Sequence, residues 1–220
     1  MNVFDILGPV MIGPSSSHTA GAARLGRIAN ALLGQPAVFA DILLHGSFAK
    51  TYKGHGTDKA LVAGILGMAT DDERIRFSLE EAKKSGLSLS ISTGEIDGAH
   101  PNTARITLTG QDGKTISLRG SSIGGGNIQV TSVNDMDVSF TGERTAFLVL
   151  HRDTPGTIAA VTELLAEYDM NICNFRLSRK ERGGQAVMTI EVDGSPAEEI
   201  KEKIQRLPNI YTCTVLWAQS

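Results

Sequence analysis

The sequence predicts an α+β protein with two domains: a mixed α/β domain at residues 1–143 and a ferredoxin-like βαββαβ domain at residues 147–220. In the second region, short apolar runs alternate with helical patterns in the order β-α-β-β-α-β. In the first, helical patterns give way to alternating strand patterns from Leu87 onward. The polar segment Thr141-Gly142-Glu143-Arg144-Thr145 separates the two regions.

The C-terminal domain is expected to place two helices among four strands. Asp153-Thr154-Pro155-Gly156 turns the chain into the first helix, with Asp or Thr as N-cap and Pro in the first turn. Glu181-Arg182-Gly183-Gly184 is typical of a hairpin turn, and Ser195-Pro196-Ala197-Glu198 of a capping box. The strands are expected at 147–152, 171–179, 185–192 and 210–217, and the inward helical positions are Ile158, Val161, Leu164, Leu165 and Tyr168, then Ile200, Ile204 and Leu207.

The N-terminal domain is expected to begin with helices and to end with strands. Leu25, Ile28, Ala29 and Leu32 lie on one side of a helix predicted at 19–33. The other predicted elements are a buried strand within 38–48, a helix capped by Thr57, a more polar helix at 71–84, and strands at 87–93, 103–108, 114–119 and 128–133, with a tight hairpin turn at Asp112-Gly113.

Composition and charge exclude several classes of protein. With a net charge of −3 and a pI of about 6.0, the chain gives no reason to expect nucleic acid or a membrane as partner. No apolar run approaches the roughly 18 to 20 residues that a membrane span needs, and the N-terminus lacks the basic region of a secretory signal. Because the chain has only two cysteines, we expect no disulfide framework and a cytoplasmic location.

The segment Gly13-Pro14-Ser15-Ser16-Ser17-His18-Thr19 precedes the first predicted helix. Three hydroxyls, an imidazole and the free N–H groups of a helix N-terminus would converge there, which favours binding of a carboxylate or phosphate. The alternative interpretation is a helix cap, a common role of Ser and Thr.

A second motif, Lys53-Gly54-His55-Gly56-Thr57-Asp58, also ends at a predicted helix start. Glycines on both sides of His55 would let the backbone pass close to a ligand. An imidazole there is suited to removing a carbon-bound proton or, when charged, to binding a carboxylate. A surface loop with Thr57 as cap is the alternative.

Two further segments are polar and rich in turn residues. His100 and Asn102 flank Pro101 before a strand and could bind the carboxylate or ammonium group of an amino acid, with a plain β-turn as the alternative. The glycine-rich segment 120–127 offers backbone amides for an anion, or a bend or bulge. Its Gly-x-Ser-x-Gly pattern around Ser122 is followed by a strand former rather than the helix of a nucleophile elbow, and the chain has no nucleotide-binding pattern.

Cys173 and Cys213 fall in the second and fourth strands of the predicted ferredoxin-like sheet. Those strands are its opposite edges, so the two thiols should be too far apart to bridge. An iron–sulfur cluster takes about four thiolates, or three with an open iron, and this chain cannot supply them. We expect both cysteines to be packing residues and no metal site within this chain.

Taken together and in this order, the motifs resemble iron–sulfur-dependent L-serine dehydratases. The resemblance rests on Phe4-Asp5, on the segments 13–19 and 53–58, and on His100-Pro101-Asn102. The C-terminal domain, with Asp153-Thr154-Pro155-Gly156 at its first turn, resembles an ACT domain. The chain as a whole is similar to the separate beta chain of the two-subunit bacterial type. Its first domain is similar to the allosteric substrate-binding domain of some phosphoglycerate dehydrogenases.

The resemblance implies deamination of L-serine to pyruvate and ammonia, with a [4Fe-4S] cluster on a partner alpha chain, so that this chain alone would be inactive. It implies that His55 is a base or orienting group; in some family members a second His stands where this chain has Gly56. A non-catalytic amino-acid sensor is the alternative, and a homodimer of the isolated chain is plausible for either. The expected substrate-binding positions are Ser15, Ser16, Ser17, His18, Thr19, Gly54, Thr57, His100 and Asn102.

Overall fold

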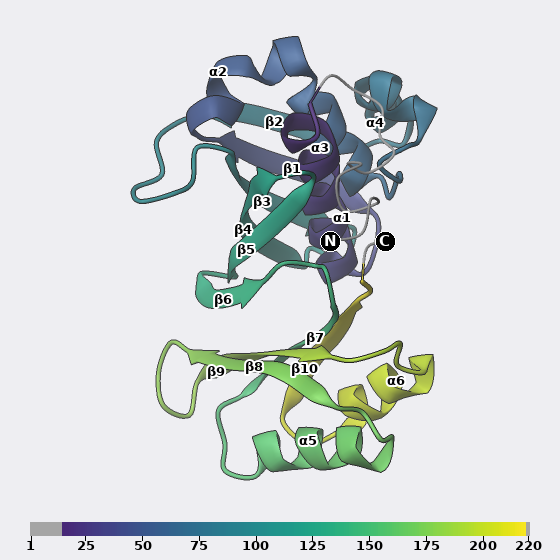
Figure 1. Ribbon diagram of the computed structural model, residues 1–220, viewed down its shortest axis with the longest axis vertical. Coiled ribbons are helices and arrows are strands. Elements are labelled where there is room, and N and C mark those ends of the chain that lie inside the picture. Colours follow the sequence, from purple (N-terminus) through teal and green to yellow (C-terminus); the bar gives the residue numbers. More distant parts are fainter. Residues whose placement is uncertain (1–14, 219–220) are drawn as a thin grey trace, which may run out of the picture. The chain divides into compact units, whose positions relative to one another are not determined.

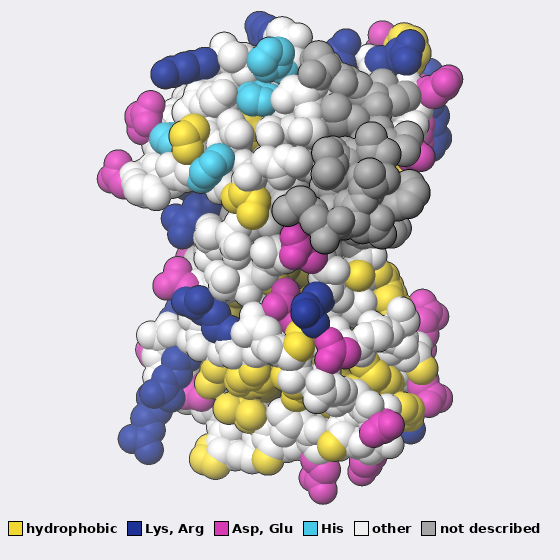
Figure 2. Space-filling view, viewed as in Figure 1, with side chains coloured by type: hydrophobic (Ala, Val, Ile, Leu, Met, Phe, Trp, Pro, Cys, Tyr) yellow, Lys and Arg dark blue, Asp and Glu magenta, His cyan; other side chains and the backbone are white. Residues whose placement is uncertain are grey.

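The computed structural model describes residues 15–218 and divides between Asn134 and Asp135 into two compact units (Figure 1). The α+β class is as predicted. Acidic and basic side chains are scattered over both units on the face drawn in Figure 2, in keeping with the small net charge. No helix within residues 15–218 is long and apolar enough to cross a membrane.

The first unit contains the predicted helices followed by the predicted strands, with one additional helix, α2. The predicted polar helix at 71–84 consists of two pieces, η3 and α4. The elements are η2 (Ser17–Gly21), α1 (Ala22–Leu33), β1 (Ala37–Leu44), α2 (Gly46–His55), α3 (Thr57–Ile65), η3 (Glu73–Phe77), α4 (Ser78–Lys84), β2 (Ser88–Thr93), β3 (Thr103–Gly110), β4 (Thr115–Gly124) and β5 (Asn127–Val133).

The strands of the first unit take the order β2-β1-β3-β4-β5 in their sheet. β1 is parallel to β2 and antiparallel to β3, and β3, β4 and β5 follow as an antiparallel meander. Along β1, Ala40, Ile42 and Leu44 are fully buried, whereas Phe39 on the other face is 41% exposed. α1 packs against β3 and β4. The sheet therefore has one face covered by helices and one face, that of Phe39, which we call the open face.

Helices α1 and α3 cross with their backbones in close contact. A methyl group added at Gly26 would stand 2.3 Å from the carbonyl oxygen of Leu61, and one added at Gly64 would stand 2.0 Å from that of Ala23. Neither position leaves room for a side chain. The crossing therefore requires glycine on both helices.

The α2 region corrects the sequence prediction. The strand ends at Leu44, and the residues before His55 form a helix instead of an open loop. Phe48 is the one buried residue of this helix, so its sequence carries almost no apolar period by which a helix could be recognised. Thr57 does not cap α3, because Gly56 occupies the N-cap position and no side-chain cap is formed.

The second unit begins with β6 (Met136–Phe140), a strand that the sequence prediction did not include. Met136, Val138 and Phe140 are buried at alternate positions, which is the period that could have revealed it. The predicted border between residues 143 and 147 falls after this strand, whereas the compact units divide before it.

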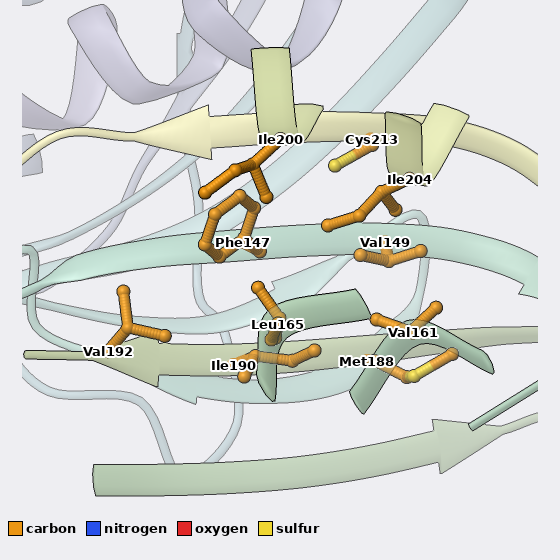
Figure 3. Close-up of a cluster of buried hydrophobic side chains, with 10 residues drawn as sticks. All are labelled: Phe147, Val149, Val161, Leu165, Met188, Ile190, Val192, Ile200, Ile204 and Cys213. Carbon is orange, nitrogen blue, oxygen red and sulfur yellow. The ribbon is translucent and has the colours of Figure 1, made fainter. Parts of the chain in front are cut away.

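The rest of the second unit has the predicted βαββαβ order. Its four-stranded sheet has the order β10-β7-β9-β8, so β8 and β10 are the edges, as expected for a ferredoxin-like fold. Side chains from the sheet and both helices form one core, drawn in Figure 3. The elements are β7 (Thr145–Arg152), α5 (Thr157–Glu167), β8 (Ile172–Arg179), β9 (Gln185–Val192), α6 (Glu198–Arg206) and β10 (Ile210–Leu216).

The predicted side-chain caps of both helices in this unit are wrong. α5 starts after Gly156, which is in the left-handed conformation, and α6 starts after Ala197; neither has a side-chain cap. Asp153 instead accepts hydrogen bonds from the Gly183 N–H at 3.1 Å and from Arg179 at 2.6 Å. These bonds hold the pKa of Asp153 below its usual range. The carboxylate therefore fixes the turn between β8 and β9 rather than the helix.

We expect Gly64→Ala to destabilise the protein by about 1–3 kcal/mol, because the methyl group would force α1 and α3 apart. Gly54→Ala is the matched control: Gly54 is also helical, but an added methyl group meets nothing within 4 Å. Chemical denaturation followed by circular dichroism measures both. Equal unfolding midpoints for the two variants would show that the helix crossing can relax at no cost.

Candidate active site

His18 lies at the centre of a cluster of side chains in the first unit. Its Nδ1 is 3.3 Å from Ser15 Oγ, and its Nε2 is 3.2 Å from Ser47 Oγ. Its ring meets those of Phe48 and His55 in edge-to-face geometry, with centroids 5.2 and 4.8 Å apart. These five residues are called the histidine cluster below. Figure 2 shows histidine side chains gathered at the surface of this unit.

The three serines lead into the π-helical turn η2. The Gly21 N–H donates to the Ser16 carbonyl, five residues back, at 2.9 Å. Such turns are rare and occur frequently at functional sites. Ser16 makes no side-chain cap, while Ser15 Oγ accepts the His18 N–H at 3.4 Å and also contacts the His18 ring. Ser15 thus combines the capping role with holding the imidazole, and Ser17 lies half-buried in the same turn.

η2 rests directly on β4. A methyl group added at Gly21 would stand 2.2 Å from Ser122 Oγ, and Ser122 is fully buried. β4 continues to Gly124 and is followed by β5, so no helix follows Ser122 and the hydrolase pattern is excluded. The strand register shifts between Ser122 and Gly124, so this segment contains the bulge that was one of its two interpretations.

His55 is the last residue of α2 and is exposed, in contrast to His18, which is 8% exposed. Gly56 ends the helix in the left-handed conformation with φ of 72°, which favours glycine. The position that holds a second His in some family members is thus this helix-ending glycine, and the imidazole in contact with His18 is that of His55. Gly54 is exposed on the same turn and borders open space.

The segment His100-Pro101-Asn102 meets α2 through its backbone. The Pro101 carbonyl accepts the Ser47 N–H at 2.7 Å. His100 Nδ1 accepts the Asn102 N–H at 3.1 Å, and Asn102 Nδ2 donates to the Ser122 carbonyl at 3.4 Å. Within residues 15–218, no hydrogen bond joins either side chain to the imidazoles of the cluster. The backbone of this segment thus contacts α2, but the exposed side chain of His100 is not part of the histidine cluster.

The two predicted substrate-binding threonines are buried. Thr19, which follows His18, is 2% exposed, and Thr57, which follows Gly56, is 0% exposed. The hydroxyl oxygen of each is enclosed and has no hydrogen-bond partner among residues 15–218. A buried hydroxyl without a partner costs about 1–3 kcal/mol. Both oxygens lie beneath the surface, so they could support the cluster from inside, and their contact with substrate stays a prediction.

The pKa of His18 is lowered from 6.5, first by burial and second by the charge of the neighbouring His55; a hydrogen bond with Ser47 opposes both effects. His18 is therefore neutral near pH 7 and accepts or donates single hydrogen bonds through its two ring nitrogens. Because His18 is neutral, it places no positive charge beside the exposed His55.

Sequence reasoning did not identify Ser47, Phe48 or His45. His45 is buried, and its Nδ1 accepts the Ile96 N–H at 3.1 Å, which places the ring proton on Nε2. The Glu95 carboxylate is 3.3 Å from the same Nδ1, but a nitrogen that accepts the amide cannot also donate to it, so this contact is not an ion pair. Gly46 was the one signal that the strand ends there.

The described residues do not form a metal centre. Within residues 15–218, no group of three or more His, Cys, Asp or Glu side chains is arranged to hold a metal ion. Cys173 and Cys213 lie on the opposite edge strands β8 and β10, as predicted. Burial raises the pKa of Cys213 to about 12, so its thiol stays protonated. Cys173 is exposed, which corrects the expectation that both cysteines are packing residues.

Comparison with known proteins gives matches over both units. Residues 2–95 match the serine dehydratase beta chain family, and residues 145–209 match the ACT domain family. The chain is 45% identical to the probable L-serine dehydratase beta chain of Bacillus subtilis, with 97% of this chain and 96% of that one covered. It is 38% identical to the L-serine dehydratase beta chain of Peptoniphilus asaccharolyticus, with 92% of each covered. It is also 36% identical to a D-3-phosphoglycerate dehydrogenase of Methanocaldococcus jannaschii, over 61% of this chain and 25% of that enzyme.

The fold and these matches define the class first: an α+β chain whose ferredoxin-like unit is an ACT domain. Within that class, the chain belongs to the serine dehydratase beta chain family, as its motifs predicted. The four motif residues Phe4, Asp5, Gly13 and Pro14 lie outside the described residues.

We expect the His18 imidazole to titrate below pH 6.5, and its pKa to rise in His55→Gln, because the neighbouring charge is one cause of the lowering. Since the folded-state pKa is lowered, stability linked to His18 is present above the unfolded-state pKa and is lost as pH falls through the folded-state value. A histidine NMR titration of wild type and variant measures this. An unchanged His18 pKa in the variant would remove His55 as a cause.

Proposed function

We propose that this chain is the beta subunit of an iron–sulfur L-serine dehydratase that works in the cytoplasm and converts L-serine to pyruvate and ammonia. The observation that carries the proposal is the pairing of an exposed imidazole, His55, with a buried neutral one, His18, among serine hydroxyls. The relatives whose printed names are L-serine dehydratase beta chains cover almost the whole chain and support it.

The reaction removes an α-proton and a β-hydroxyl group from L-serine. His55 accepts the α-proton at a ring nitrogen and then gives it to the departing hydroxyl group, so that water leaves and aminoacrylate forms. This tautomerises to the imine, which water hydrolyses to pyruvate and ammonia. General base catalysis of the first step needs an imidazole within reach of the substrate, and His55 is the exposed one of the pair.

The serine hydroxyls and His18 act around that base. Ser15 and Ser47 hold both nitrogens of the His18 ring, so its orientation is fixed. Ser16 and Ser17, both half-buried at the start of η2, would receive the substrate carboxylate. Asn102, whose side-chain amide donates to the Ser122 carbonyl, would be a further polar contact for the substrate.

The residues of this chain do not fit a [4Fe-4S] cluster, because its two cysteines lie on opposite edges of one sheet. We therefore assign the cluster to a partner alpha chain, where it would polarise the substrate hydroxyl. The beta chain alone is then inactive.

The test is activity after co-expression with a cognate alpha chain under anaerobic conditions. His55→Ala should lower kcat for pyruvate formation by about 10²–10⁴-fold, the usual effect of removing a general base. Lys50→Ala, an exposed change on the same helix, is the matched control and should leave the rate unchanged.

A normal rate in His55→Ala would remove His55 from the mechanism. Calorimetry of the isolated chain addresses the sensor alternative, because tight binding of L-serine at the histidine cluster without a partner would favour regulation over catalysis. Weak or absent binding at the histidine cluster would favour a site completed by the alpha chain.

We further propose that the isolated chain forms a homodimer through β8. This strand is an edge of the ACT sheet, and Phe175 and Leu177 on its helix side are each 37% exposed. Their partners across the strand pair, Ile190 and Met188, belong to the buried core, so the apolar face continues to the edge without cover. A second copy would bury it and pair the free backbone groups.

We expect Phe175→Glu to raise the dimer dissociation constant at least about 10-fold, since a buried carboxylate would have no partner at the edge. Tyr211→Glu is the control: Tyr211 is an exposed aromatic residue on the opposite edge strand, β10. Sedimentation velocity over a concentration series measures both. A monomeric wild type, or dissociation by Tyr211→Glu alone, would contradict pairing through β8.

A further inference from the structure

A second polar pocket lies on the open face of the first unit's sheet. It has a volume of about 220 Å³ and is formed by the loop 97–100 and by β3, β4 and β5. Ser121 lines it, whereas the next residue, Ser122, points to the covered face against η2. The pocket is therefore on the other side of the sheet from the histidine cluster, and the proposed reaction does not use it.

Two arginines stand side by side on the open face, and one of them lines this pocket. Arg119 on β4 lines it and pairs directly with Arg105 on β3 in the antiparallel register. Like charges directly opposite each other on neighbouring strands are unfavourable. Within residues 15–218, neither guanidinium forms an ion pair with a carboxylate. A bound anion would offset the repulsion between these two guanidinium groups.

Arg119 is held in place by one neighbour. Its Nε donates to Thr131 Oγ1 at 3.2 Å, and that hydroxyl donates back to the Arg119 carbonyl at 3.3 Å. The guanidinium is therefore oriented through Nε, and its two Nη groups remain as a donor pair, the geometry that binds a carboxylate in two places.

The other polar groups of the pocket have defined roles. Thr103 Oγ1 donates to the His100 carbonyl at 2.6 Å, so Ser121 must be the donor of the 2.7 Å bond between the two hydroxyls. Ser121 then offers only acceptor lone pairs to a ligand. His100 Nδ1 accepts the Asn102 N–H, which leaves an N–H donor on Nε2. Asp97 adds a carboxylate acceptor.

We propose that this pocket binds a small carboxylate that carries a hydrogen-bond donor on the neighbouring carbon, as in an α-amino acid or a 2-hydroxy acid. The ligand carboxylate lies on the Nη groups of Arg119 and the Nε2–H of His100. Its ammonium or hydroxyl group donates to Ser121 Oγ or Asp97. The site is independent of the chemistry at the histidine cluster.

The test is calorimetric titration of the full-length chain with L-serine, L-lactate and acetate. At least one of the first two should bind, and acetate, which lacks the donor, should bind at least about 10-fold more weakly. Arg119→Gln should weaken binding at least about 10-fold. Arg76→Gln, an exposed arginine of the same unit outside the pocket, is the matched control. His55→Ala should bind like wild type, which separates this site from the proposed active site.

Amide chemical shifts of the wild type give a second readout that needs no variant. The ligand that binds should shift the signals of Ser121 and Thr131 before those of Ser15 and His18. The proposal is overturned if neither L-serine nor L-lactate binds, if acetate binds equally well, or if Arg119→Gln binds like Arg76→Gln. Shifts confined to the histidine cluster would also overturn it, while leaving the proposed function untouched.

Discussion

The carbonyl oxygen of Pro101 sets where α2 begins, and the histidine cluster depends on that position. It accepts the N–H groups of Ser47 at 2.7 Å and of Phe48 at 3.4 Å, donors that the first turn of a helix leaves without partners. Gly46 permits the approach, since its φ is 59° and an added methyl group would stand 2.5 Å from that oxygen. Ser47 and Phe48 are then the two residues of α2 that meet His18 from one side.

On its other side, the cluster is fixed by the contact between η2 and the sheet. Gly21 lets the π turn lie against Ser122, and the turn places Ser15 and His18 together. The first turn of α2 and η2 thus hold the two nitrogens of one imidazole from opposite directions. His55 needs no such hold, because it is the exposed end of a helix already fixed at its start.

The sequence was sufficient where burial follows a simple period. The βαββαβ order was predicted because apolar positions such as Val161 and Leu165 recur at helical spacing. α2 was missed because Phe48 is its one buried residue, so no apolar period marks the helix. The N-caps of α5 and α6 were mispredicted because Gly156 and Ala197 precede these helices, and neither residue forms a side-chain cap that a sequence pattern could indicate. The two histidine motifs were recognised separately, but their meeting, and the part of Ser47, depend on backbone contacts that leave no pattern in the sequence.

The charge arrangement explains why the proposed catalytic site needs a second chain. The pKa of the buried His18 imidazole is lowered, so His18 stays neutral, and under the proposed function the exposed His55 accepts the α-proton. His55 is exposed, however, and a base that removes a carbon-bound proton works best where water is excluded. Under the proposed function, the alpha chain would cover this surface and bring the iron that two cysteines on opposite sheet edges cannot hold. Proton transfer would then belong to one chain, and departure of the hydroxyl to the other.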